Sequence, residues 1–98
     1  MGPEKLFENK VRKLLESNGA YVVKYFGCAF TKSGVPDLLV CLNGKFLAIE
    51  VKAEKGKASD LQLHNIAQIQ ASGGIAMVLY PKDFDKFKSL VVQLAHNK

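Results

Sequence analysis

An Asn-Gly pair at positions 43 and 44 lies between two apolar runs. Such a pair is typical of the two-residue turn of a β-hairpin, in which both central residues take positive φ. With this turn, Leu42 faces Lys45, and each step outward gives the next pair. The further predicted pairs are Cys41 with Phe46, Val40 with Leu47, Leu39 with Ala48, Leu38 with Ile49, and Asp37 with Glu50.

The last of these pairs places two carboxylates, Asp37 and Glu50, opposite each other at the open end of the hairpin. Opposed side chains have Cβ atoms roughly 4.5–5.5 Å apart, and like charges there are destabilising. A proton held by one carboxylate or a cation between the two would relieve the repulsion. Because strand side chains alternate between faces, Lys52 lies on the same face as Glu50, while Ile49 and Val51 point into the core. We therefore expect three charged side chains to cluster on one face.

Length and composition narrow the class of protein. A chain of 98 residues with 48% hydrophobic residues fits one compact domain over residues 1–98. No apolar run approaches the roughly 20 residues that cross a bilayer, and the charged N-terminus lacks an apolar signal-peptide core. We therefore expect an intracellular protein in a prokaryotic or viral context. Fourteen Lys and Arg against nine Asp and Glu give a net charge of +5, which modestly favours an anionic partner.

The two cysteines, Cys28 and Cys41, have no metal-ligand spacing. A zinc site is therefore not expected, and a disulfide is disfavoured in a reducing compartment. We interpret both as ordinary packing thiols.

Hydrophobic periodicity and turn signals predict the order helix, three strands, helix, strand, helix. The segment 45–52, the helix that follows it and the strand at 75–80 form a right-handed βαβ crossover with parallel strands. The fold class is therefore α/β, with a mixed sheet between helices. The predicted elements are a helix ending at Asn18-Gly19, a strand at 20–26, the hairpin, a helix from a Ser59–Gln62 capping box to Gly73-Gly74, a strand at 75–80, and a last helix capped by Asp83.

An Asp that begins one strand and a Glu-x-Lys in the next, on an αβββαβ order, resemble the PD-(D/E)XK nuclease superfamily. Here these residues are Pro36-Asp37 and Glu50-Val51-Lys52. Together with Gly34-Val35, Gln62 and Gly73, they are more closely similar to the VRR-Nuc domain, the virus-type replication-repair nucleases. The resemblance covers nearly the whole chain and implies a restriction-endonuclease-like core.

This resemblance implies a metal-dependent DNA endonuclease that hydrolyses phosphodiester bonds, selects branched DNA such as Holliday junctions, and acts as a homodimer. Leu61, on an otherwise polar helix face, is a candidate interface contact. Mg²⁺ or Mn²⁺, which prefer oxygen ligands, would lie between Asp37 and Glu50, with the Val51 backbone carbonyl as a further ligand. Lys52 would orient the attacking water or stabilise charge in the transition state.

Two further site residues follow from the resemblance, each with an alternative. The family carries a Glu on its first helix, and Glu8 matches it by its spacing to Gly19, although Glu4 lies one turn earlier near the same face. Gln62 either completes the capping box by accepting from the Ser59 N–H or lies near the metal. The sequence leaves the choice open for Gln62.

Lysines near the predicted site are candidate phosphate contacts. Lys32, Lys55 and Lys57 fall in loops beside the expected metal, although any one such lysine taken alone is most often a solvated surface side chain. Lys24, in the first strand, either reaches a phosphate or covers apolar surface with its stem.

Two other functions compete with a DNA nuclease. A catalytically silent DNA-binding or adaptor domain could keep the fold, but such relatives typically lose an acidic residue or the Lys, and Asp37, Glu50 and Lys52 are all present. A hydrolase for another phosphodiester such as RNA shares the same chemistry.

Overall fold

Helices and strands follow one another in the predicted order. The computed structural model describes residues 1–97. Its elements are α1 (Pro3–Ser17), β1 (Tyr21–Lys24), β2 (Leu38–Leu42), β3 (Lys45–Val51), α2 (Asp60–Ala71), β4 (Ile75–Leu79), the 3₁₀ turn η1 (Pro81–Asp83) and α3 (Phe84–His96).

The strands form a mixed sheet in the order β1-β2-β3-β4, as the α/β prediction requires. β1 with β2 and β2 with β3 pair antiparallel, and β3 with β4 pair parallel through the crossover that contains α2. The hairpin register is confirmed over the five pairs from Leu42 with Lys45 to Leu38 with Ile49. Asn43 has φ 51° and Gly44 φ 78°, so both turn residues take the positive φ that the Asn-Gly pair indicated.

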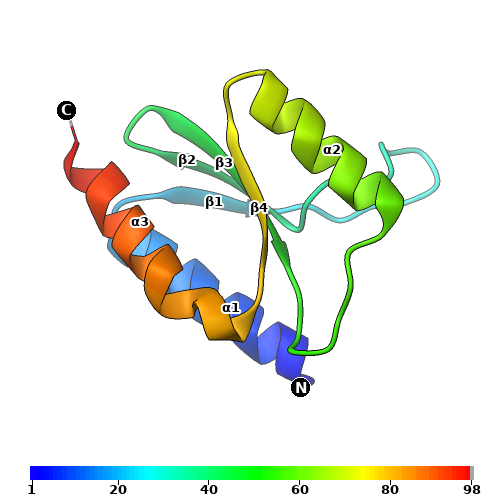
Figure 1. The fold of residues 1–98 in the computed structure, drawn as a ribbon, viewed down its shortest axis with the longest axis horizontal. Helices are drawn as coiled ribbons and strands as arrows, with labels where there is room; N and C mark the ends of the chain where they lie inside the picture. Colours follow the sequence, from blue (N-terminus) through cyan, green and yellow to red (C-terminus); the bar gives the residue numbers. More distant parts are fainter. Residues whose placement is uncertain (98) are drawn as a thin grey trace.

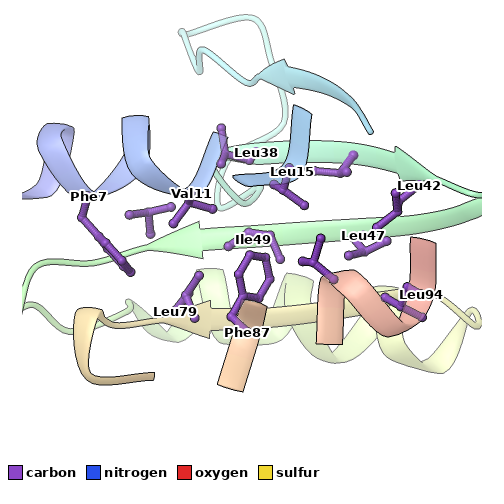
Figure 2. Close-up of a cluster of buried hydrophobic side chains, with 13 residues drawn as sticks. Phe7, Val11, Leu15, Leu38, Leu42, Leu47, Ile49, Leu79, Phe87 and Leu94 are labelled. Carbon is purple, nitrogen blue, oxygen red and sulfur yellow. The ribbon is translucent and has the colours of Figure 1, made fainter. Parts of the chain in front are cut away.

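Helices cover both faces of the sheet, with α1 and α3 on one side and α2 on the other (Figure 1). The main core lies on the α1 and α3 side, where alternate residues of the hairpin meet the apolar stripes of both helices (Figure 2). Burying each such Leu, Ile or Val stabilises the fold by about 1.5–3 kcal/mol. Its members are Phe7, Val11, Leu15, Leu38, Val40, Leu42, Leu47, Ile49, Val51, Leu79, Phe87, Val91 and Leu94.

The α2 side of the sheet is covered unevenly. Ala48 and Ala76 pack with Ile66 of α2, so the helix lies over β3 and β4. The same face of β1 and β2 is open: Tyr21 is 72% exposed and Val23 is 42% exposed. We call the exposed side chains of this region, Tyr21, Val23, Cys41 and, on β3, Phe46, the uncovered sheet face; Leu39 of β2 packs against the α2-side cluster.

Helix ends follow the sequence signals with one exception. The Ser59–Gln62 capping box is present in both directions. Asp83 does hold the position before α3, but its side chain makes no capping hydrogen bond, so the predicted cap is wrong. The reason is the backbone: η1 leads directly into α3, and Asp83 has φ −100° and ψ 7°, whereas an N-cap side chain reaches the helix from an extended conformation.

Both cysteines are free and exposed, so their interpretation as packing thiols is wrong. Cys28 lies in the loop between β1 and β2. Cys41 lies on the uncovered sheet face, between Tyr21 and Phe46, where α2 does not reach.

Among the helices of residues 1–97, none combines the length and the apolar character that a bilayer span requires.

Candidate active site

Asp37 lies at the open end of the hairpin, immediately before β2 and next to the end of β3. Its Oδ2 accepts a hydrogen bond from the Val51 backbone N–H at 3.0 Å. The N–H and C=O of a strand residue point to the same edge of the strand, so the Val51 carbonyl is expected at the same edge of β3 as this hydrogen bond. The turn register therefore brings together the carboxylate and the carbonyl that were predicted as metal ligands.

Glu50 is buried within the sheet, with 2% of its surface exposed. Its Oε2 lies 3.2 Å from Lys52 Nζ and accepts a hydrogen bond from Gln62 Nε2 at 3.0 Å. Its Oε1 is buried without a hydrogen-bond partner. Burial, and after it the negative charge of Asp37, raise the pKa of Glu50, and the Lys52 ammonium opposes this shift without cancelling it. A buried carboxylate oxygen without a partner is costly unless a ligand completes it.

Gln62 completes the capping box and also contacts Glu50, one of the predicted metal ligands. Its Oε1 accepts from the Ser59 N–H at 2.8 Å, while its Nε2 donates to Glu50. The capping bond fixes the side-chain oxygen, and this leaves the amide nitrogen directed towards the carboxylate. The start of α2 is therefore tied to the charged cluster.

A second cluster of charges lies on the α1 side of the same edge. Glu8 is 3% exposed; its Oε1 is 2.5 Å from Lys24 Nζ and its Oε2 is 2.9 Å from Lys5 Nζ. Burial raises the pKa of Glu8, but the two lysines outweigh it and leave the pKa below its ordinary value. Glu4 is exposed in the first turn of α1, so the structure places Glu8 rather than Glu4 at the site.

Lys24 joins the two clusters, because its Nζ also lies 3.4 Å from Asp37 Oδ1. Burial lowers the pKa of Lys24, but the contacts with Glu8 and Asp37 raise it by a larger amount, so the net shift is upward. Its side chain is only 19% exposed. The structure therefore gives Lys24 two internal partners, and a phosphate contact through this residue stays a prediction.

The arrangement fits a divalent cation by its donor set. Asp37, Glu50 and the Val51 carbonyl supply oxygens, and the unpartnered Glu50 Oε1 is available to a ligand. Within residues 1–97 there is no group of three or more His, Cys, Asp or Glu side chains positioned for a metal. Mg²⁺ suits such a sparse set, because it usually keeps several waters and binds one or two carboxylates together with substrate phosphate.

A polar cleft of about 350 Å³ opens beside Asp37. It is lined by Asp37, by Gln62 and by residues of the loop between β1 and β2, among them Tyr25 and Lys32. Lys32 is exposed at this cleft. Lys55 and Lys57 are exposed in the loop that follows β3 and line a different cavity.

Three residues that position the cleft were not among the predicted site residues, although Gly34 belongs to the motif. The Tyr25 hydroxyl donates to the Lys32 carbonyl at 2.7 Å, and buried Asn65 donates to the Ser33 carbonyl at 3.3 Å. Gly34 lies against α2, close to Leu61 and Asn65. The signal for Asn65 was available, because a polar residue three positions after Gln62 interrupts the apolar face of the helix.

Substituting Gly34 by Ala is expected to destabilise the protein by about 1–3 kcal/mol, as in overpacked sites. Gly34 has φ +77°, and an added Cβ would lie 2.6 Å from Leu61 Cγ and 3.0 Å from the Leu61 carbonyl oxygen. Gly19→Ala is the matched control, because Gly19 has φ +89° with nothing within 4 Å of the added Cβ. Equal losses for the two variants in chemical denaturation would show that backbone strain alone, and not the contact with α2, matters at Gly34.

Substituting Glu50 by Gln is expected to stabilise the metal-free protein by about 1 kcal/mol at neutral pH, because a buried, incompletely partnered charge is removed. The pKa of Glu50 is raised, so the folded state binds its proton more tightly than the unfolded state. The stability that protonated Glu50 contributes is therefore lost as pH rises through the pKa of Glu50 in the folded state. The difference in unfolding free energy between Glu50→Gln and wild type should accordingly shrink as pH falls towards the ordinary carboxyl range. Denaturation in EDTA across pH measures this.

Exposed Glu16 provides the control, since Glu16→Gln should leave stability unchanged. Adding Mg²⁺ should stabilise the wild type more than Glu50→Gln, because binding to the folded state adds to stability. A Glu50→Gln protein that is less stable than wild type in EDTA would contradict the description of Glu50 as a destabilising charge.

Comparison with known proteins gives two findings. The family model for the VRR-NUC domain matches residues 6–83. Among solved structures, the chain is similar to Archaeoglobus fulgidus Hjc, a Holliday junction resolvase from an archaeal hyperthermophile, with a TM-score of 0.60 and 22% sequence identity. That match covers 78% of this chain and 66% of the resolvase chain, just under two thirds of its length. No curated protein matches the chain.

Proposed function

Because the chain belongs to the VRR-NUC family, we propose that it is a metal-dependent nuclease that hydrolyses phosphodiester bonds in DNA. The observation that carries this proposal is Glu50, whose buried Oε1 has no partner although its Oε2 has two. Replacing this buried charge with an apolar side chain would be expected to increase the stability of the folded state, so stability alone does not explain Glu50. Asp37 and Lys52 lie beside it, so the unpartnered oxygen would be placed to bind a metal ion at a reactive site.

Asp37, Glu50 and the Val51 carbonyl would hold Mg²⁺ or Mn²⁺, which when bound would polarise a phosphate oxygen and lower the pKa of water. Lys52 places its ammonium beside Glu50, where it can orient the attacking water or stabilise charge that develops on the phosphate. Gln62 holds Glu50 Oε2 through its amide, which limits rotation of the carboxylate. Each of these residues lies on a regular element or on its terminus, so the geometry is set before DNA binds.

Glu8 and Lys24 support the site from the α1 side. Lys24 lies between Glu8 and Asp37, and it neutralises Asp37 while no metal is present. Lys52 does the same for Glu50. These two lysines reduce the repulsion that two neighbouring carboxylates would otherwise cause in the free protein.

Branched DNA of the Holliday-junction kind is the proposed substrate. The similar archaeal protein is described as a Holliday junction resolvase, and the chain itself carries a net charge of +5. A domain of this size has little surface with which to read sequence, and this favours recognition of backbone shape. Lys32 at the cleft and Lys55 and Lys57 beside β3 are the proposed phosphate contacts.

A homodimer is proposed, so that two sites can cut two strands. The uncovered sheet face supports it, because Tyr21, Val23 and Phe46 expose 72%, 42% and 46% of their surface within one region. Leu61 of α2, at 48% exposure, is a further candidate contact. Sedimentation of wild type and Val23→Asp measures this: a dimer that dissociates in the variant supports the assignment, and a dimer that persists places the interface elsewhere.

Incubating the purified protein with a labelled four-way junction tests the function. Cleavage with Mg²⁺ or Mn²⁺ that stops in EDTA is the expected result. A panel of flap, junction, plain duplex and RNA substrates then ranks the preference. Binding without cleavage under either metal would indicate a silent DNA-binding domain, and preferential cutting of RNA would reassign the substrate.

A further inference from the structure

The C-terminal end of β4 lies beside the end of β3, because the two strands are parallel neighbours. The last ladder pair is Val51 with Leu79, and the Lys52 N–H donates to the Leu79 carbonyl at 3.1 Å. Lys52 and Tyr80 are therefore the next residues along each strand. Neighbouring strands lie about 4.8 Å apart, so the Tyr80 backbone is about one strand spacing from that of Lys52.

Alternation along β4 places Tyr80 on the same side of the sheet as Glu50. Val78 packs with the α2-side cluster, whereas Leu79 is buried in the main core. Tyr80 follows Val78 by two residues and so shares its face. Tyr80 is partly buried, and the Lys82 ammonium lies 5.8 Å from its ring centroid.

A cavity of about 360 Å³ forms where the loop after β3 meets the segment after β4. The β3 loop contributes Glu54, Lys55, Gly56 and Lys57, and the other wall consists of Tyr80, Pro81 and Lys82. Three lysines against one glutamate make this cavity basic. Its size is within the range of pockets that hold small ligands. We call it the Tyr80 pocket.

We propose that the Tyr80 pocket binds one unpaired nucleotide next to the scissile phosphate. The base stacks on the Tyr80 ring, and the neighbouring phosphates contact Lys55, Lys57 and Lys82. An aromatic surface within a basic groove is the combination by which proteins hold single-stranded nucleic acid. This inference rests on the proposed nuclease function and specifies which part of the substrate that site recognises.

A consequence for selectivity follows from the position of the pocket. A base that is paired and stacked in a duplex has to leave the helix before it can reach Tyr80, and this unpairing is least costly at a branch or a gap. The pocket therefore favours substrates that already carry an unpaired nucleotide beside the cut.

Binding to a labelled flap duplex in EDTA, measured by fluorescence anisotropy, tests the proposal without catalysis. Tyr80→Leu keeps apolar bulk and is expected to bind about tenfold more weakly, because stacking on an aromatic ring is lost. Tyr80→Phe keeps the ring and should bind like wild type. Thermal unfolding of both variants verifies that the fold is intact.

A second test uses flap duplexes in which one abasic site is moved stepwise along the unpaired strand; a purely structural role of Tyr80 would not change its result. The wild-type protein should lose about tenfold in affinity when the abasic site is at one particular position. Tyr80→Leu should lose no further affinity at that position, because the ring and the missing base contact each other. Lys82→Gln should weaken all substrates alike and reduce the salt dependence, whereas Lys88→Gln on the exposed side of α3 should change neither.

The failures of the two proposals are distinguishable. If Tyr80→Leu binds as wild type does, or if its loss adds fully to the abasic loss, the Tyr80 pocket does not hold the base, and the nuclease function stands. If wild-type protein binds none of the labelled DNA substrates, the proposed function fails and this inference fails with it.

Discussion

Asp37→Asn is expected to reduce the rate of metal-dependent cleavage by about 10³-fold or more. Asn retains an oxygen that can accept from the Val51 N–H, so the 3.0 Å hydrogen bond and the local backbone can persist. The negative charge is lost, and with it one of the two carboxylates that would hold the cation. A metal contributes several kcal/mol of charge stabilisation in such reactions, and each 1.36 kcal/mol changes the rate tenfold. Initial rates on a labelled four-way junction give the measurement.

DNA binding provides the internal control for this variant. Asp37→Asn removes a negative charge next to the substrate, so affinity for the junction in EDTA should be unchanged or higher. Asp85→Asn, on the exposed first turn of α3, changes the net charge equally and should cleave at the wild-type rate. Cleavage by Asp37→Asn within tenfold of wild type would exclude Asp37 as a metal ligand.

The part of the site that the sequence predicted best is the part fixed by local geometry. The Asn43-Gly44 turn determines the hairpin register, and the register determines which residues lie at its open end. Two strands and their alternation were thus sufficient to bring Asp37, Glu50 and Lys52 to one edge. The capping box positioned Gln62 in the same way, because its spacing is local.

The partners that join distant elements were harder to predict. The contact of Lys24 with Glu8 spans 16 residues and depends on how α1 packs across the sheet, and periodicity does not specify that packing. The choice between Glu4 and Glu8 also required this packing, since both lie near one face of α1. The simultaneous contacts of Gln62 with Ser59 and Glu50 likewise appear only when α2 is placed over the sheet.

The exposed cysteines have a related cause. Cys41 alternates correctly with Val40 and Leu42, and the sequence cannot tell which strands α2 covers. Because α2 lies over β3 and β4 and its cluster reaches β2 only at Leu39, Cys41 farther along β2 on that face remains open. An uncovered apolar face of this kind is itself informative, since large exposed apolar patches mark interaction sites.

Lys52→Ala is expected to lower kcat by about 10²–10³-fold, as is typical when one charge-stabilising group is removed. The Lys52 ammonium lies 3.2 Å from Glu50 Oε2, and in the proposed mechanism it would act on the reacting water or phosphate. Affinity for Mg²⁺ should be retained or higher, because a cation next to the metal ligands is removed. Single-turnover rates at saturating metal, together with metal titration by calorimetry, separate the two effects. Lys88→Gln is the control for the change in net charge.

Stability has to be measured together with these rates, because Lys52 also compensates a buried charge. Without Lys52, the pKa of Glu50 should rise further, since the one cation that opposes the shift is lost. The metal-free variant should therefore be less stable than wild type at neutral pH, and Lys52→Ala combined with Glu50→Gln should recover most of that loss. Mg²⁺ should restore the stability of the single variant, while its cleavage rate at saturating Mg²⁺ stays low. If that rate instead equals the wild-type rate, Lys52 serves to position Glu50 and takes no part in the reaction.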